Sequence, residues 1–242
     1  NDIVPKRAEI LKSNLDKWGN SRVAVSNNTL SQIRGTGILF DCILVDAPCS
    51  GEGMFRKDRD SQQHWHEDLP ASCSVLQEGI LAEALQLLAP GGYLIYSTCT
   101  FARVENEMRW LWLTERGLQP IDLHFPDEWG FLDVHTDFPQ IPTGVAYRSV
   151  PGISRGEGFF ICCFQKPGKS AFEETHSKRQ VRESVGDLAF QLDEGLVLHE
   201  SKSGTVYAGL ASQFEWCKSA GKEVRILREG TALGHWQGKA FV

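Results

Sequence analysis

The chain has 242 residues, and its 31 Asp and Glu against 25 Lys and Arg give a formal net charge of −6. A hydrophobic content of 41% is enough for a packed core and excludes global disorder. The length suits one large domain or one domain with a smaller companion. No apolar run reaches the ~18 residues of a transmembrane helix, so we expect no membrane partner. The acidic balance argues against a general nucleic-acid coat protein but allows a local basic groove.

The chain begins with Asn rather than Met and ends within a strand-like segment, so we expect a fragment of a longer protein. Its seven cysteines are an odd number and include no Cys-x-x-Cys pair, which argues against a disulfide framework and a zinc knuckle. We therefore expect a reducing, cytoplasmic setting. Cys42, Cys162 and Cys163 lie in apolar runs and are predicted to be buried.

Strand and helix patterns alternate along the first two thirds of the chain. Apolar runs and helical spacing predict, in order, helix 5–18, strand 22–26, strand 40–46, helix 72–89, strand 93–98, helix 103–116 and strand 158–164. Pro-Gly-Gly at 90–92 predicts a turn, and 121–157 is irregular. The nearly continuous apolar run at 40–46 is typical of a strand buried on both faces of a parallel sheet. The alternation predicts a doubly wound α/β sheet, in which ligands bind beyond the carboxyl ends of strands.

The last third of the chain changes in character. Residues 167–189 are rich in charged and small side chains and predict a linker. Residues 190–242 predict a second, β-rich unit with strands near 194–199, 205–209 and 223–227. Basic side chains in this unit are candidate RNA phosphate contacts, namely Lys222, Arg225, Arg228 and Lys239.

Two cysteines differ from the other five because small or polar residues flank them. Cys49 lies in Asp-Ala-Pro-Cys-Ser-Gly, directly after the 40–46 strand, and Cys99 lies in Ser-Thr-Cys-Thr, directly after the 93–98 strand. Neighbouring strand ends in such a sheet can bring two thiols to one pocket. The pair could also be two unrelated loop cysteines.

These motifs resemble the Rsm/Nop-type RNA cytosine-C5 methyltransferases that use S-adenosylmethionine, and are most similar to the bacterial RsmF-type small-subunit rRNA enzymes. The matching segments are Asp-Ala-Pro-Cys-Ser-Gly-Glu-Gly at 46–53, Arg-Lys-Asp at 56–58, Pro-Gly-Gly at 90–92, Tyr-Ser-Thr-Cys-Thr at 96–100, Glu-Asn-Glu at 105–107 and Gly-Glu-Gly-Phe-Phe at 156–160. The resemblance covers residues 1–166 and implies a class I (Rossmann-like) methyltransferase sheet without its first strand and helix. Residues 190–242 resemble part of a PUA-like RNA-binding domain. The alternative is a β-rich accessory domain with no RNA-binding role.

The resemblance assigns Cys99 as the nucleophile that adds to cytosine C6, because carbon 5 is a poor nucleophile until aromaticity is broken. Cys49 would promote release of the product. Asp46 would bind the cytosine edge near N3, or act only as a strand-end cap. The resemblance also places Pro48 and Gly51 against the base. Arg56 and Lys57 would contact RNA phosphate, with a solvated loop or an internal ion pair as an equal alternative.

The cofactor site implied by the resemblance is incomplete in this sequence, since no Gly-rich loop precedes the first predicted strand. Asp2 matches the acidic residue that binds the ribose hydroxyls. Asn28, or Asn27, stands where many members have an Asp that meets the adenine. Asp46 would also border the cofactor.

Several alternatives follow from the same residues. A cysteine after Pro48, rather than an aromatic residue, favours carbon over nitrogen methylation. Two alternative functions are an inactive relative that binds RNA in ribosome assembly and a methyltransferase that acts on tRNA. We expect the protein to be a monomer. His64 and His66 lack a third metal ligand nearby, so no metal is expected. The Glu-Asn-Glu run at 105–107 is interpreted as helix capping, and Trp112 as core.

Overall fold

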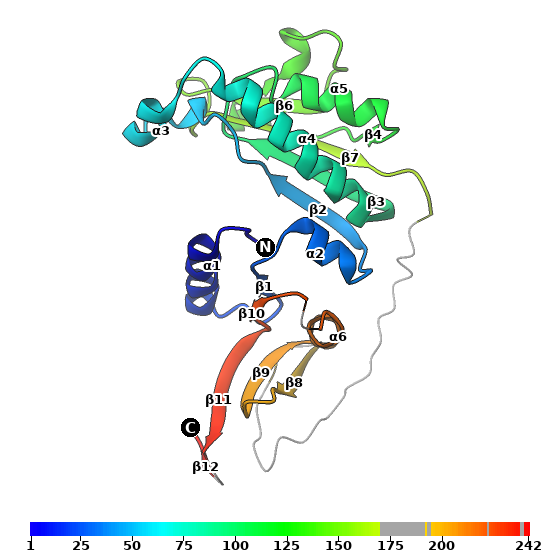
Figure 1. Cartoon of the computed structure of the whole chain (residues 1–242). Coiled ribbons are helices and arrows are strands. Elements are labelled where there is room, and N and C mark those ends of the chain that lie inside the picture. Colours follow the sequence, from blue (N-terminus) through cyan, green and yellow to red (C-terminus); the bar gives the residue numbers. More distant parts are fainter. Residues whose placement is uncertain (170–191, 193–194, 222, 238–239) are drawn as a thin grey trace. The chain divides into compact units, whose positions relative to one another are not determined.

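The structure of the protein, a computed structural model, describes residues 1–169, 192, 195–221, 223–237 and 240–242 (Figure 1). The chain forms two compact units, one of residues 1–38 with the described part of 174–242, and one that begins at residue 39 and is described to residue 169. Among the described residues, no helix combines the length and apolar character needed to cross a membrane.

The unit that begins at residue 39 is a mixed α/β layer structure. Its strands are β2 (Phe40–Asp46), β3 (Leu88–Thr98), β4 (Gln119–Pro120), β5 (Leu132–Asp133), β6 (Ala146–Ser149) and β7 (Phe159–Gln165). Its helices are α3 (Arg59–His64), α4 (Leu69–Leu87) and α5 (Glu107–Glu115), with short 3-10 turns η1 (Glu52–Met54), η2 (Asp127–Trp129) and η3 (Val134–Thr136). The sheet has the order β2-β3-β7-β6-β5, and β4 also pairs with β7.

The pairing of β2 with β3 brings together the loops that carry Cys49 and Cys99. The two strands run parallel, with Asp46 opposite Ser97, so their carboxyl ends meet at the same edge of the sheet. β3 and β7 are antiparallel, with Tyr96 opposite Cys162. The predicted α/β class is therefore confirmed, and the sheet is mixed rather than wholly parallel.

The core lies between the sheet and helices α4 and α5, and Figure 1 shows α4 running along β2 and β3. Leu94 and Tyr96 of β3 and Phe164 of β7 are fully buried, as is Leu81 of α4. Trp110 of α5 packs on Phe164 with a centroid distance of 5.8 Å. Each such side chain contributes about 1.5–3 kcal/mol on burial. Trp112 is also buried, as predicted.

The prediction that β2 is buried on both faces is wrong. Cys42 and Leu44 are exposed on the face opposite the helices, Leu44 by 63%. The reason is that side chains alternate along β2, so that Ile43 and Val45 pack into the core on the helix side while Cys42 and Leu44 lie on the other face, which is exposed. Cys162 and Cys163 of β7 are buried as predicted, because that strand has neighbours on both sides.

The other unit is built from the N-terminal and the C-terminal segments of the chain. It contains α1 (Pro5–Trp18), β1 (Val25–Ser26), α2 (Leu30–Gly35), β8 (Leu196–Glu200), β9 (Thr205–Leu210), α6 (Ala211–Ser219), β10 (Ile226–Arg228), β11 (Thr231–Gln237) and β12 (Ala240–Phe241). β1 pairs with β10, and the remaining strands form an antiparallel sheet in the order β12-β11-β9-β8. This grouping crosses the predicted boundary at residue 166, so the division into 1–166, 167–189 and 190–242 stays a prediction. Residues 170–189 of the predicted linker lie outside the described residues.

Of the basic residues expected to contact RNA from this unit, Arg228 holds the unit together instead. Arg228 is 3% exposed, and its guanidinium binds Asp16 at 2.8 Å and the Val23 carbonyl. Arg225 exchanges backbone hydrogen bonds with the Asn28 side chain. Lys222 and Lys239 lie outside the described residues. Arg228 is therefore a structural residue, because its charge is already paired and buried.

Candidate active site

The two unusual cysteines meet at the edge formed by the ends of β2 and β3. The Sγ atoms of Cys49 and Cys99 are 3.2 Å apart, and the Cys99 backbone N–H donates to Cys49 Sγ at 3.4 Å. Both thiols are half-buried, so a substrate can reach them. The structure thus brings together the two side chains that the motifs singled out.

The sulfur contact makes the two thiols chemically unequal. A hydrogen bond from Cys49 lowers the pKa of Cys99 below its ordinary value, although burial opposes this shift. The same contact, with burial, raises the pKa of Cys49, since losing its proton would leave two thiolates in contact. Of the two thiols, Cys99 is therefore the one that loses its proton more readily, and Cys49 is the one that holds it more tightly.

A buried carboxylate holds the loop that carries Cys49. Glu105 is fully buried and accepts hydrogen bonds from the Ser50 N–H at 3.1 Å and from the Ser50 hydroxyl. Gln77 of α4, also fully buried, donates to Glu105 at 2.7 Å and to the Pro48 carbonyl at 2.9 Å. Burial raises the pKa of Glu105, while these donors oppose the shift. Both neighbours of Cys49 in the chain are thus fixed in place.

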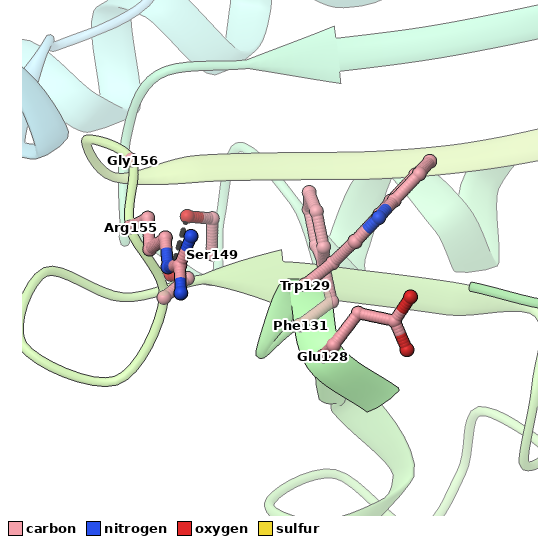
Figure 2. Close-up of a pocket in the computed structure, with 7 residues that line it drawn as sticks. Glu128, Trp129, Phe131, Ser149, Arg155 and Gly156 are labelled. Atoms are coloured by element: carbon pink, nitrogen blue, oxygen red, sulfur yellow. Dashed lines mark hydrogen bonds between the residues drawn. The ribbon is translucent and has the colours of Figure 1, made fainter. Parts of the chain in front are cut away.

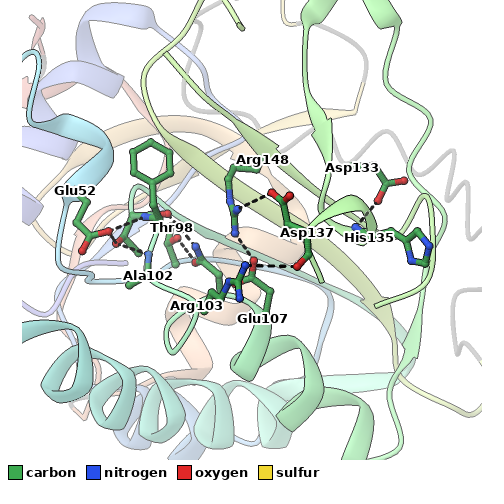
Figure 3. Close-up of polar contacts among 12 residues, drawn as sticks. Glu52, Thr98, Ala102, Arg103, Glu107, Asp133, His135, Asp137 and Arg148 are labelled. Atoms are coloured by element: carbon green, nitrogen blue, oxygen red, sulfur yellow. Dashed lines mark hydrogen bonds and ion pairs between the residues drawn. The ribbon is translucent and has the colours of Figure 1, made fainter. Parts of the chain in front are cut away.

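A second carboxylate ties the Cys49 loop to the Cys99 loop. Glu52 accepts hydrogen bonds from the Phe101 N–H at 3.2 Å and from the Thr100 hydroxyl at 3.3 Å (Figure 3). Its other oxygen accepts from Trp65 Nε1 at 3.2 Å. The Ser50 and Thr100 hydroxyls add a contact of 2.7 Å. The relative position of the two thiols is therefore set by side chains on both loops.

Two glycines allow the loops to approach the start of β7. Gly51 has a φ of 72°, in the left-handed region that favours glycine. Gly53 donates to the Cys99 carbonyl at 2.9 Å and accepts from the Gly158 N–H at 3.0 Å. A β-carbon on Gly53 would lie 2.5 Å from the Gly158 carbonyl oxygen. Any other residue at this position would push the loop away from β7.

The start of α5 differs from the capping interpretation. Asn106 makes no side-chain cap; it accepts from the Thr98 hydroxyl at 2.6 Å and donates to the Thr100 carbonyl at 2.9 Å. Glu107 is fully buried and pairs with Arg148, which also faces Asp137 (Figure 3). The capping interpretation is wrong because the side chains of Glu105 and Asn106 bond to the two cysteine loops and not to the helix end. The sequence alone did not identify them as residues that support the site. Their position within the family motif was the signal that could have done so.

The remaining predicted site residues of this unit lie on exposed parts of the loop. Asp46 is exposed and accepts from the Ser97 hydroxyl at 3.4 Å. Arg56 forms a two-bond ion pair with Glu157, with contacts of 2.9 and 3.2 Å, which is the internal-pair alternative. Lys57 is exposed, and its ammonium has no hydrogen-bond or ion-pair partner among the described residues. Pro48 is exposed and Gly51 is half-buried. His64 and His66 belong to no group of three potential metal ligands within the described residues.

The two other predicted cofactor residues belong to the unit of residues 1–38. Asp2 accepts from the Val4 N–H at 2.8 Å and pairs with Arg7 at 2.9 Å. Asn28 is 2% exposed, and both atoms of its amide group bond the backbone of Arg225, at 2.8 and 3.1 Å. Both oxygens of the Asp2 carboxylate and both polar atoms of the Asn28 amide are therefore engaged within their own unit.

The sequence profile of the 16S rRNA methyltransferase RsmB/F family matches residues 1–165. The chain belongs to this family. The match covers most of the chain and includes both cysteine loops, so the resemblance based on the motifs is confirmed. Members of the family are S-adenosylmethionine-dependent RNA methyltransferases.

Curated relatives carry the same family assignment. The chain is 31% identical over 219 residues to the ribosomal RNA small subunit methyltransferase F of Shigella boydii serotype 18, and equally to that of Escherichia coli O81. Each match covers 82% of this chain and 44% of the relative, so the chain spans less than half the length of these proteins.

A solved structure supports the fold. The crystal structure of NSun6 from Pyrococcus horikoshii with SFG superimposes with a TM-score of 0.57 at 23% identity, over 69% of this chain and 41% of that one. At this identity the likeness concerns the fold alone. It agrees with the Rossmann-like methyltransferase sheet that the family motifs imply.

Proposed function

We propose that the protein transfers a methyl group from S-adenosylmethionine to carbon 5 of a cytidine in small-subunit rRNA, through a covalent adduct with Cys99. The observation that carries the proposal is the 3.2 Å contact between the Cys49 and Cys99 sulfurs at the edge of a RsmB/F-family sheet. A protein that acts on rRNA would work in the cytoplasm, as expected from the sequence. The monomeric state remains a prediction.

Cys99 starts the reaction as the thiolate. Its lowered pKa makes the sulfur a nucleophile that adds to cytosine C6, forming a C–S bond and moving an electron pair toward the N3 edge. The exposed Asp46 carboxyl, or a proton held there, would meet that edge and stabilise the developing charge. Carbon 5 becomes enamine-like and able to attack an electrophilic methyl group.

Cys49 acts after methylation. Addition converts the Cys99 thiolate into a neutral thioether, which removes the charge that raises the pKa of Cys49. Cys49 can then release its proton to solvent water and, as the thiolate, accept the proton from carbon 5. The C5–H electron pair forms the C5–C6 double bond, the C6–S bond breaks, and Cys99 leaves as a thiolate. A sulfur 3.2 Å from Cys99 Sγ is close enough to reach the carbon next to C6.

The residues present fit the cofactor in part. S-adenosylmethionine, when bound, supplies the electrophilic methyl group. Asp46 is exposed beside the thiol pair, and Asp2 has the carboxylate that ribose hydroxyls require. Asn28 does not fit an adenine contact in this conformation, because Arg225 occupies its amide and the residue is 2% exposed. For RNA, Lys57 provides the free charge, while Arg56 is bound to Glu157.

Cysteine substitutions test the proposal. In the full-length protein, with radiolabelled RNA and S-adenosylmethionine, Cys49→Ala should accumulate a protein–RNA adduct that survives a denaturing gel, because addition proceeds and elimination stalls. Cys99→Ala should form no adduct and no methylated RNA. Cys42→Ala is the matched control, since that thiol is exposed on the opposite face of the sheet. Accumulation of the adduct by Cys99→Ala instead would reverse the two roles.

A further inference from the structure

A hollow separate from the cysteine pair lies in the same unit. It has a volume of about 440 Å³, within the range of small-ligand pockets. Its walls are Glu128, Trp129 and Phe131 on one side and Ser149, Arg155 and Gly156 on the other (Figure 2). None of these residues takes part in the proposed chemistry, and the family motifs name only Gly156 among them.

The aromatic side of the hollow presents the indole ring of Trp129, which is held in place by neighbouring rings and is accessible to solvent. Trp129 ends the turn η2, and its ring packs on Phe125 with a centroid distance of 5.7 Å and a tilt of 33°. Phe125 in turn stacks on Phe131 at 4.8 Å and meets Tyr147 edge-on at 5.0 Å. Trp129 nevertheless remains 52% exposed. An indole supported on one side and open on the other is the arrangement on which an unpaired nucleobase stacks.

The polar walls carry opposite, unpaired charges. Among the described residues, neither Arg155 nor Glu128 has a hydrogen-bond or ion-pair partner for its side chain. Arg109 of the same unit, by contrast, is paired with Glu78. A free guanidinium matches a phosphate, and a carboxylate accepts hydrogen bonds from the amino groups of a base. A nucleotide carries both groups, joined to a flat ring.

The hollow is connected to the cysteine loops by a short path. Gly156 is two residues before Gly158, a reach of at most about 7 Å. Gly158 donates to Gly53, and Gly53 donates to the Cys99 carbonyl, at 3.0 and 2.9 Å. Glu157, between the two glycines, binds Arg56 of the Cys49 loop. The hollow is therefore within reach of a nucleotide that flanks a target base placed at Cys99.

We propose that this hollow binds an unpaired nucleotide of the RNA substrate that flanks the target cytidine, with its base stacked on Trp129 and its phosphate on Arg155. Glu128 would accept a hydrogen bond from the base edge. The inference rests on the proposed function, because it assumes that the cysteine pair acts on RNA. It makes Trp129 and Arg155 substrate-positioning residues outside the family motifs.

The test uses the whole protein and single-stranded RNAs with one cytidine and one 2-aminopurine at successive flanking positions. We expect fluorescence quenching at one flanking position when the wild type binds, and its loss in Trp129→Ala with about fivefold to tenfold weaker binding. Arg155→Gln should weaken binding and lower the slope of log K against log salt by roughly one. The control Trp18→Ala, an indole 85% exposed in the other unit, should leave both quantities unchanged.

The two proposals fail in different ways. Equal quenching and affinity in wild type and Trp129→Ala, with methylation intact, would overturn the nucleotide site and leave the proposed function in place. Absence of both methylation and adduct in any cytidine RNA would overturn the proposed function and the nucleotide site with it. If Trp129→Ala lowers the unfolding temperature, Arg155→Gln decides, because the Arg155 side chain is exposed and has no hydrogen-bond or ion-pair partner among the described residues. An unchanged salt slope in that variant would overturn the phosphate contact.

Discussion

Replacing Glu105 should disturb the active site more than its distance from the thiols suggests. Glu105→Ala removes the acceptor of three buried donors, the Ser50 N–H, the Ser50 hydroxyl and Gln77 Nε2, of which the hydroxyl keeps its contact with Thr100. A buried donor left without a partner costs about 1–3 kcal/mol, so the free energy of unfolding should fall by about 2–5 kcal/mol. Urea unfolding measures this loss.

Glu105→Gln separates charge from geometry. An amide oxygen in the place of Oε2 can still accept from Ser50 N and Gln77, and the amide NH₂ can donate to the Ser50 hydroxyl. We expect Gln to retain stability to within about 1 kcal/mol. Burial raises the pKa of Glu105, so the stability from its protonated form is lost as pH rises through that raised pKa. Relative to the wild type, Glu105→Gln should therefore gain stability as pH rises.

The functional assay is alkylation of Cys99 by iodoacetamide across pH, together with single-turnover methylation. In Glu105→Ala the Cys49 loop loses its tether, so the pH midpoint for Cys99 alkylation should rise and methylation should fall about 10- to 100-fold. Glu105→Gln should restore both. Glu107→Ala is the matched control, since Glu107 is equally buried but pairs with Arg148. It should lose stability without moving the Cys99 midpoint. The positioning role is refuted if Glu105→Ala is destabilised yet keeps the wild-type midpoint and methylation rate.

Two further changes test the surroundings of the thiols. Gly53→Ala should lower methylation by about tenfold or more, because its β-carbon would lie 2.5 Å from the Gly158 carbonyl oxygen. The control is Gly79→Ala in α4, where a β-carbon would have no neighbour within 4 Å. This variant should keep its activity, and its free energy of unfolding in a urea titration should rise by about 0.5–1 kcal/mol. Glu157→Gln should tighten RNA binding several-fold in filter assays at low salt, because it frees Arg56 and removes a negative charge, while stability should change little because the ion pair is exposed to solvent. Unchanged affinity would show that Arg56 does not face RNA.

The local pattern of the sequence predicted the elements that carry the site. Helix α1 matched the predicted bounds 5–18, β2 matched 40–46, and β7 began and ended within one residue of its prediction. These segments have strong periodicity or continuous apolar runs, which depend on near neighbours in the chain. Helix α6 was not predicted, because only Phe214 of its nine residues is buried and its apolar stripe is weak.

Pairing across the chain was beyond such patterns. The sequence did not indicate that β1 pairs with β10, with Val25 opposite Arg228, or that β2 lies at a sheet edge with Leu44 exposed. Periodicity says which residues seek burial, and the partner that covers them is a property of the whole fold. For the same reason Arg228 was assigned to RNA when it is buried against Asp16.

The sequence by itself determined the chemistry available to this protein, since the Pro-Cys and Thr-Cys motifs identified the family and the two thiols. Only the tertiary structure decided how those thiols differ. The parallel pairing of β2 with β3 brings Cys49 and Cys99, 50 residues apart, to 3.2 Å, and Glu105 reaches back 55 residues to hold Ser50. A hydrogen bond between sulfurs, and the pKa difference that it creates, depends on distances of a few tenths of an ångström, which arise from packing and not from spacing along the chain.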